Sequence, residues 1–204
     1  MFALIESGSI TKYLNGNKGI TLGDTQYPRS IYTLWSAAER EAIGIYEVVF
    51  DDSNKKDEQW YINTNQSFAF ANDTVTASYG TATAKAHADT TWTQEQIDDG
   101  YAPDGADTNT VAVRGLKYNL IRAVKGQAAS ELAKTDWYIT RNAEKSTAIP
   151  SAITTHRDLV RSRQATMETS ITNASNTAAL ETLYAYTTDS DGVTSRPLAE
   201  IPTL

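Results

Sequence analysis

The spacing of apolar residues changes between the two halves of this chain, and this change constrains the fold more than any other sequence feature. In residues 1–80 apolar side chains recur at alternate positions, as at Phe68 and Phe70, a spacing typical of strands with one buried face. From about Val111 they recur at spacings of three and four, as expected for one stripe of a helix. Strands followed by helices, rather than alternating with them, indicate the α+β class.

Short motifs place the elements of the first half. The sequence Glu6-Ser7-Gly8-Ser9 separates two strand-like runs, and Asn72-Asp73 separates two more, so each predicts a hairpin turn. Ser36-Ala37-Ala38-Glu39 matches a capping box, which predicts a short helix that Gly44 ends in a left-handed conformation. The β-branched and aromatic run 45–50 follows as a strand. We therefore expect a β-rich, antiparallel domain over residues 1–80 with one short helix.

The second half predicts a helical hairpin. One helix is expected to run from about residue 111 to Thr135, and a second to begin at Pro150, a residue suited to a first helical turn. Its apolar seam is interrupted by Arg157 and Gln164. The seam residues are Ile153, Val160, Met167, Ile171 and Ala174. A third short helix and a small terminal strand pair complete a domain over residues 110–204, joined to the first domain by an acidic, irregular connection over residues 81–109.

Composition and charge exclude several classes of protein. The chain of 204 residues has no cysteine, so it has neither disulfides nor thiolate chemistry. A carboxylate at position 6 and the lack of 18 consecutive apolar residues argue against a signal peptide and a membrane span. Residues 1–110 hold 7 Lys/Arg against 16 Asp/Glu, and residues 111–204 hold 11 against 9. Because phosphate binding needs a clustered basic face, we expect no nucleic-acid or membrane partner.

No pattern of residues indicates catalysis or a cofactor. His87 and His156 lie in different halves, without a recognisable metal-ligand spacing. The glycines between Gly16 and Gly23 fit neither a phosphate loop nor a dinucleotide fingerprint, and no Gly-x-Ser-x-Gly elbow occurs. We therefore predict a protein that is not an enzyme and that carries no cofactor.

One acidic segment is a weak candidate for calcium, because hard oxygen ligands on a glycine-containing loop can hold that ion. Its carboxylates are Asp98, Asp99, Asp104 and Asp107. Their spacing departs from that of an EF-hand loop, and no glutamate closes it at the twelfth position. A solvated acidic loop is the favoured interpretation, and Asp189 and Asp191 are interpreted as turn residues.

A motif in the second half resembles a known family. Leu132 to Arg141 contains Thr-Asp-Trp, and Ile149-Pro150 and then His156 to Arg161 follow it. This resembles the tail-assembly-chaperone-like segment of tailed bacteriophages, in which a helix ends in Thr-Asp-Trp, a proline starts the next helix, and Tyr-Arg is followed four residues later by Arg. The pattern is kept at Thr135, Asp136, Trp137, Pro150, Arg157 and Arg161, whereas His156 stands where tyrosine is usual. The match covers roughly 30 residues. The segments Met1–Gly8 and Leu34–Tyr46 also look like a short N-terminal module of phage tail and tail-fibre-associated proteins.

The resemblance implies a non-enzymatic structural component of a tailed-phage virion, in the tail, baseplate or fibre attachment, made in the host cytoplasm. Its partners would be other virion proteins. Separately, the polar-interrupted seam from Ile153 to Ala174 favours a homo-oligomer, since a residue such as Gln164 in a seam can fix register. Two alternatives remain open: a transient assembly chaperone for a tail or tail fibre, and a host-surface glycan-binding protein. For the motif itself we expect a structural role, with Trp137 buried at the bend and with Arg157 and Arg161 paired to Asp136 or Glu131.

Overall fold

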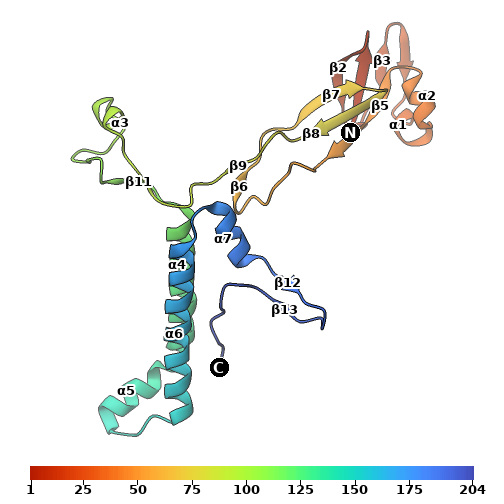
Figure 1. Cartoon of the computed structure of the whole chain (residues 1–204). Coiled ribbons are helices and arrows are strands. Elements are labelled where there is room, and N and C mark those ends of the chain that lie inside the picture. The colour runs from red at the N-terminus through yellow and green to blue at the C-terminus, as the bar shows by residue number, and fades with distance from the viewer. The chain divides into compact units, whose positions relative to one another are not determined.

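The computed structural model describes all 204 residues and has the predicted α+β class. The chain forms two compact units, Met1–Thr83 and Ala84–Leu204 (Figure 1). Strands dominate the first unit and helices the second. None of the helices is both long and apolar enough to cross a membrane.

A five-stranded sheet forms the centre of the first unit. Its strands are β1 (Phe2–Glu6), β2 (Ser9–Leu14), β5 (Ile45–Asp51), β7 (Ser67–Ala71) and β8 (Thr74–Ser78), in the order β2-β1-β5-β8-β7. Both predicted hairpins are confirmed, and Asn72 and Asp73 have the positive φ angles, 48° and 56°, that a tight hairpin turn requires. The pairing of β5 with β8 is parallel, so the prediction of an antiparallel sheet is wrong there. Alternation within a strand fixes its buried face but not the direction of a distant partner.

The two faces of this sheet bury separate apolar clusters. One face packs Leu4, Leu14 and Ile45 under α1 (Ile31–Leu34), α2 (Ala37–Glu41) and the hairpin of β3 (Ile20–Leu22) with β4 (Thr25–Tyr27). The other face buries Ala3, Val48, Val75 and Ala77. On that face Tyr13 of β2 lies 4.7 Å from Phe68 of β7, measured between ring centroids. The edge strands therefore curl toward each other, which shields an otherwise open apolar surface.

The predicted capping box is confirmed at the start of α2. The Ser36 side chain accepts a hydrogen bond from the Glu39 amide, and the Glu39 carboxylate accepts one from the Ser36 amide. Gly44 ends this helical segment with φ +81°, and a Cβ added there would lie 2.7 Å from the carbonyl oxygen of Ile5. Glycine is required there, both for the left-handed conformation and for the close passage of β1. Beyond β5, the short strands β6 (Tyr61–Ile62) and β9 (Thr83–Ala84) lie outside the five-stranded sheet.

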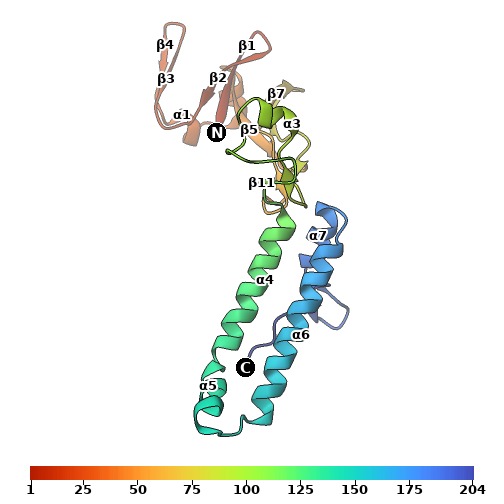
Figure 2. The ribbon, with the colours of Figure 1, turned by 90° about the vertical axis from the view of Figure 1, so that its left-hand side faces the viewer.

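The second unit is built on the helical hairpin. Helix α4 (Leu116–Ala133) lies beside α6 (Ser151–Asn173), and α5 (Asp136–Lys145) lies at the end where they are joined (Figure 2). All five predicted seam residues are buried, four of them in α6 and the fifth, Ala174, directly after it. The first helix was predicted to start too early, because residues 111–113 form strand β11 (Val111–Val113) and Val113 is 62% exposed.

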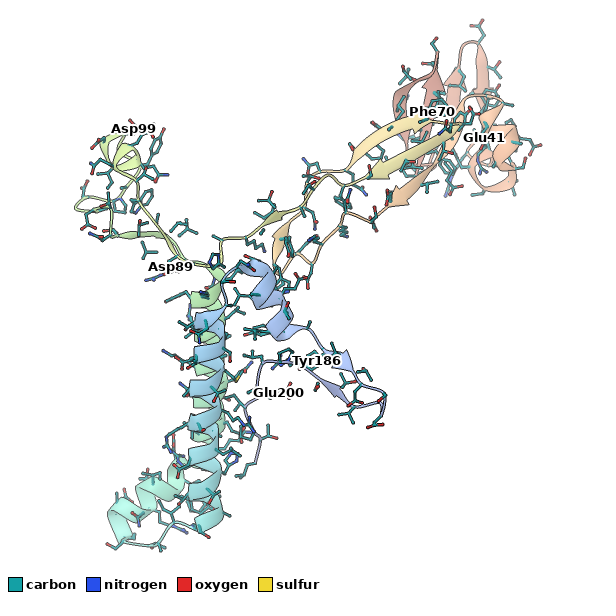
Figure 3. All side chains as sticks on the ribbon, viewed as in Figure 1. Glu41, Phe70, Asp89, Asp99, Tyr186 and Glu200 are labelled. Atoms are coloured by element: carbon teal, nitrogen blue, oxygen red, sulfur yellow. The ribbon has the colours of Figure 1, made fainter.

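The stretch predicted as an irregular connection contains regular structure. A capping box of Thr93 and Gln96 starts α3 (Gln94–Asp98), and β10 (Thr90–Thr91) pairs with β11. The Asp89 carboxylate (Figure 3) accepts hydrogen bonds from the Gly115 amide at 2.8 Å and from Arg114 Nη1 at 2.6 Å. These bonds, that of the Gly115 amide first, lower the pKa of Asp89 below its ordinary value. Asp89 thereby fixes the start of α4.

The C-terminal segment packs back on the hairpin. Helix α7 (Thr177–Tyr184) is capped by the Asn176 side chain, as predicted, and buries Leu180. The terminal pair, β12 (Thr187–Thr188) and β13 (Thr194–Ser195), is also confirmed. Beyond it Leu198 is buried, and the Tyr186 hydroxyl donates a hydrogen bond of 2.7 Å to Glu200 (Figure 3).

Candidate functional site at the closed end of the hairpin

Three of the motif residues meet where α4 gives way to α5. Arg157 of α6 is 7% exposed, and its Nη1 donates to the carbonyl oxygen of Leu132 at 2.8 Å and to Thr135 Oγ1 at 2.7 Å. The same nitrogen lies 2.9 Å from Asp136 Oδ1. We call Thr135, Asp136 and Arg157 the hairpin lock. The predicted pairing of Arg157 with Asp136 across the hairpin is confirmed.

The lock explains why the chain bends at this point. Thr135 is 1% exposed, and its hydroxyl donates to the Leu132 carbonyl instead of capping α5. The Leu132 carbonyl already accepts a hydrogen bond from the Thr135 amide, and the guanidinium adds charge-assisted hydrogen bonds to this carbonyl and to the Thr135 hydroxyl. Asp136 begins α5, where a negative charge is favoured by the helix dipole. A buried arginine with these partners holds the two helices in one register.

Trp137 does not lie where the sequence predicted. It is 51% exposed on α5, so the expectation that it is buried between the helices is wrong. The reason is that the chain does not end its helical structure at Thr135 but continues into α5, which buries none of its residues. The Trp137 ring stacks on Tyr138 with centroids 3.8 Å apart, and the Arg141 guanidinium lies 4.7 Å from the Trp137 centroid.

The remaining motif residues have separate roles. Pro150 directly precedes α6, and its carbonyl accepts hydrogen bonds from the amides of Ile153 and Thr154. Arg161 pairs only with Asp158, at 3.3 Å on the exposed side of α6. The prediction that Arg161 pairs across the hairpin is wrong, because one helical turn carries it about 5 to 6 Å away from the lock.

Glu131 is a second buried polar centre, and it pairs with Lys134 and His156 rather than with Arg157 or Arg161, so that alternative of the prediction is wrong. Its carboxylate is 6% exposed and accepts hydrogen bonds from Lys134 at 2.5 Å and from the Leu204 amide at 2.9 Å. His156, at the position where the resembled family has tyrosine, places Nε2 3.2 Å from Glu131. The hydrogen bond from Lys134, above all, lowers the pKa of Glu131. Glu131 thus ties the C-terminal end of the chain to the hairpin.

The acidic segment does not assemble a cation site. Asp98 accepts a hydrogen bond from Gln94, and Asp107 accepts from Asn109 and Thr110. No group of three or more His, Cys, Asp or Glu side chains in the chain is arranged to hold a metal ion. Asp99 and Asp104 do not join the other two carboxylates in a common cluster.

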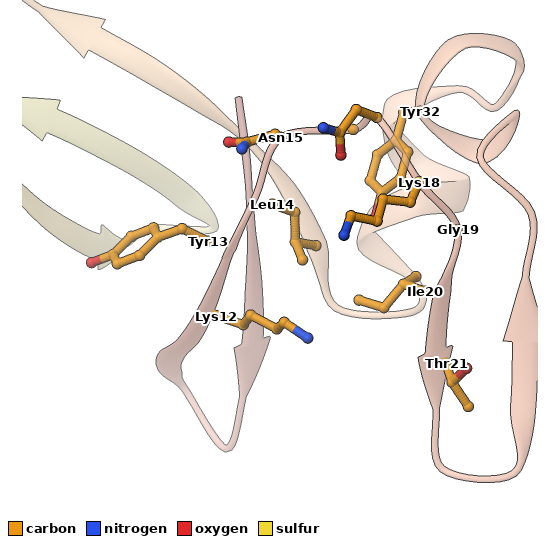
Figure 4. Close-up of a pocket in the computed structure, with 11 residues that line it drawn as sticks. Lys12, Tyr13, Leu14, Asn15, Lys18, Gly19, Ile20, Thr21 and Tyr32 are labelled. Carbon is orange, nitrogen blue, oxygen red and sulfur yellow. The ribbon is translucent and has the colours of Figure 1, made fainter.

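A cavity in the first unit was missed from the sequence. It has a volume of about 420 Å³ and lies between β2 and β3, lined by Lys12, Leu14, Asn15, Lys18, Ile20 and Tyr32 among others (Figure 4). The available signal was a pair of lysines around the turn Asn15-Gly16-Asn17, in a stretch with few other charges. Their convergence depends on how β3 folds back beside β2, which residue spacing does not reveal.

Comparison with known proteins gives no match: no family model, no curated protein and no solved structure is similar to the chain. The resemblance to phage tail proteins therefore depends on the motif residues themselves, whose geometry is described above.

Proposed function

We propose that the protein is a non-enzymatic structural component of a tailed-phage virion and that it docks onto another virion protein through the end of its helical hairpin. One observation carries this proposal. The motif is divided between the hairpin lock, in which Thr135 and Arg157 are buried, and the exposed Trp137, which is not part of the lock. An exposed tryptophan on a fixed frame is a feature of protein-binding surfaces.

The surface around Trp137 has the composition of a binding hot spot. Trp137 is 51% exposed, Tyr138 and Arg141 stack against its indole ring, and the Arg141 guanidinium also lies over the Tyr138 ring. Tryptophan, tyrosine and arginine are the residue types that contribute most to protein interfaces. Because the stack already exists in the free chain, docking orders few additional side chains, and this reduces the entropic penalty of binding.

The sequence resemblance supplies the class of partner. It favours other virion proteins of the tail, baseplate or fibre attachment, with several copies of the chain in one assembly. The alternative of a transient assembly chaperone uses the same surface, since both functions require docking. The two functions differ in whether the protein stays in the finished particle.

Particle composition tests this proposal. Purified virions are analysed by mass spectrometry for the wild-type protein, for Trp137→Ala and for Tyr118→Ala. Tyr118 is a matched control, because it is an exposed aromatic residue of the same hairpin with an arginine 4.3 Å from its ring. We expect wild-type protein and Tyr118→Ala in the particles, and Trp137→Ala depleted by about tenfold or more, as for a hot-spot residue.

Other outcomes contradict the proposal in distinguishable ways. Absence of the wild-type protein from mature virions would exclude a structural component and favour the assembly chaperone. Equal incorporation of both variants would exclude the Trp137 surface as the docking site. Stabilisation of the free protein by calcium or by a neutral host glycan would instead favour the glycan-binding alternative, because a ligand that binds the native state raises the melting temperature.

A further inference from the structure

The cavity between β2 and β3 has the shape and chemistry of a binding site for a small anion. Lys12 and Lys18 extend from its two sides, and both side-chain nitrogens point into the space between them (Figure 4). The cavity volume of about 420 Å³ is within the range of about 300 to 1,000 Å³ that is usual for small-molecule sites.

Neither lysine has an acidic partner. None of the ion pairs of the chain includes Lys12 or Lys18. The surrounding unit, residues 1–83, carries 6 Lys/Arg against 10 Asp/Glu, a net charge of −4. Two positive charges that face one cavity without carboxylates repel each other, and an anion between them removes this repulsion.

The walls of the cavity are fixed by the core of the unit. Leu14, Ile20 and Tyr32 are buried and belong to the apolar cluster beneath the sheet. The Tyr32 ring also packs on Phe2, with centroids 5.0 Å apart. The apolar floor is therefore preformed, so that a ligand has to order little besides the two lysine side chains.

We infer that this cavity binds a small molecule that carries one carboxylate or phosphate group on a hydroxyl-rich body, such as an acidic or phosphorylated sugar. The two ammonium groups bind the anion by charge-assisted hydrogen bonds. Asn15, Asn17 and Thr21 on the rim supply the donors and acceptors that hydroxyl groups require. Leu14 and Ile20 cover the apolar face of a sugar ring. The site uses only residues of the first unit and is independent of the proposed docking surface.

Calorimetric titration of the full chain tests this inference. The ligands are glucuronate, glucose 6-phosphate, glucose and inorganic phosphate, each at low and at high ionic strength. We expect saturable binding of both charged sugars, no binding of glucose, and weaker binding at high salt because exposed charges are screened. Equal affinity for inorganic phosphate and glucose 6-phosphate would contradict a role for the sugar body, whereas a preference for either charged sugar identifies which anion the site takes.

Three variants provide the controls. Lys12→Gln and Lys18→Gln each remove one ammonium group, and each should weaken binding of the charged sugars by about tenfold or more. Lys55→Gln changes the net charge of the unit equally but lies outside the cavity, so its affinity should equal that of the wild type. Melting temperatures verify that all three variants fold. An equal loss of affinity in Lys55→Gln, or the absence of saturable binding to the wild type, would overturn the inference.

Discussion

The two units of this protein bury different kinds of side chain. In the first unit the core consists of apolar clusters on both faces of a sheet, and Arg40 is its only buried charged or polar residue. The second unit buries four such residues: Glu131, Thr135, Arg157 and Thr177. The difference indicates that the fold of the sheet is determined by the packing and the alternation of its apolar side chains, whereas the register of the hairpin is determined by polar contacts.

The geometry of the elements explains this difference. On one face of the curved sheet the edge strands shield the apolar residues, and on the other face helices pack against them. Both faces can therefore bury many apolar residues. Two helices side by side bury only one stripe each, and they can slide along each other with little change in apolar contact. A buried arginine that must reach the Leu132 carbonyl and Thr135 permits only one register. The polar residues of the second unit therefore supply the specificity that its narrow apolar seam lacks.

The largest expected effect comes from breaking the hairpin lock. Arg157→Ala removes two charge-assisted hydrogen bonds, to the Thr135 hydroxyl and to the Leu132 carbonyl, together with the packing of a buried side chain. We therefore expect a loss of about 3 to 5 kcal/mol in the free energy of unfolding of the second unit. Denaturant unfolding measures it. Arg161→Ala is the matched control, because its side chain is exposed and pairs only with Asp158, so it should change stability by less than about 0.5 kcal/mol. Similar losses in the two variants would refute the lock.

The next largest loss of stability is expected from a large-to-small substitution in the core of the first unit. Ile45 is fully buried in the middle of the sheet, and Ile45→Ala should cost about 3 kcal/mol through lost burial and a residual cavity. Val49 of the same strand is 53% exposed, and Val49→Ala should cost less than about 1 kcal/mol. Circular dichroism, followed during denaturation at wavelengths dominated by helix and by sheet, assigns each loss to a unit, because the long helices lie in the second unit and the five-stranded sheet in the first. If Ile45→Ala destabilised the helical signal as much as the sheet signal, the comparison between two separately specified units would fail.

The first unit also shows how far residue spacing can predict structure. Hairpins at residues 6–9 and 72–73 and the capping box at Ser36 were predicted correctly, because each is encoded within a few neighbouring residues. The parallel pairing of β5 with β8 was not, because it joins strands separated by a long connection. The Lys12–Lys18 cavity was missed for a different reason, because the short loop between β2 and β3 does not reveal how β3 folds back beside β2.

In the second unit the errors have the opposite cause. The local sequence signals for two helix starts are present, but the prediction did not use them. Thr93 and Gln96 form the same type of capping box as Ser36 and Glu39, yet residues 81–109 were expected to be irregular. Thr135-Asp136 was interpreted as the end of a helix, although an acidic residue after threonine equally marks a beginning. Assigning the tryptophan to the wrong side of that boundary led to the expectation that it is buried.

The pH dependence of stability should also distinguish the two units, with a smaller effect than the substitutions above. Bonds to Lys134 and to the Leu204 amide lower the pKa of Glu131 from its ordinary value near 4.5. A carboxyl group with a lowered pKa in the folded state contributes stability above that ordinary value and loses it as the pH falls through the folded-state pKa. The second unit should therefore lose stability below about pH 4.5. Unfolding midpoints across this range should fall less steeply in Glu131→Gln than in the wild type, and parallel curves would exclude this contribution.

The smallest expected effect is a gain in stability, and it concerns Gly126 in the middle of α4. An added Cβ at this position meets no atom within 4 Å, and the glycine has no positive φ that would require it. Because glycine in a helix interior is less favourable than alanine, Gly126→Ala should stabilise the second unit by about 0.5 to 1 kcal/mol. Thermal unfolding checks this, with the first unit as an internal control whose transition should not move. If the hairpin is specified by its polar contacts rather than by helix propensity, the same gain should appear when Gly126→Ala is introduced into Arg157→Ala, since the two sites share no partner. A gain that disappears in the Arg157→Ala background would mean that α4 depends on the lock for its helical structure, and not only for its register against α6.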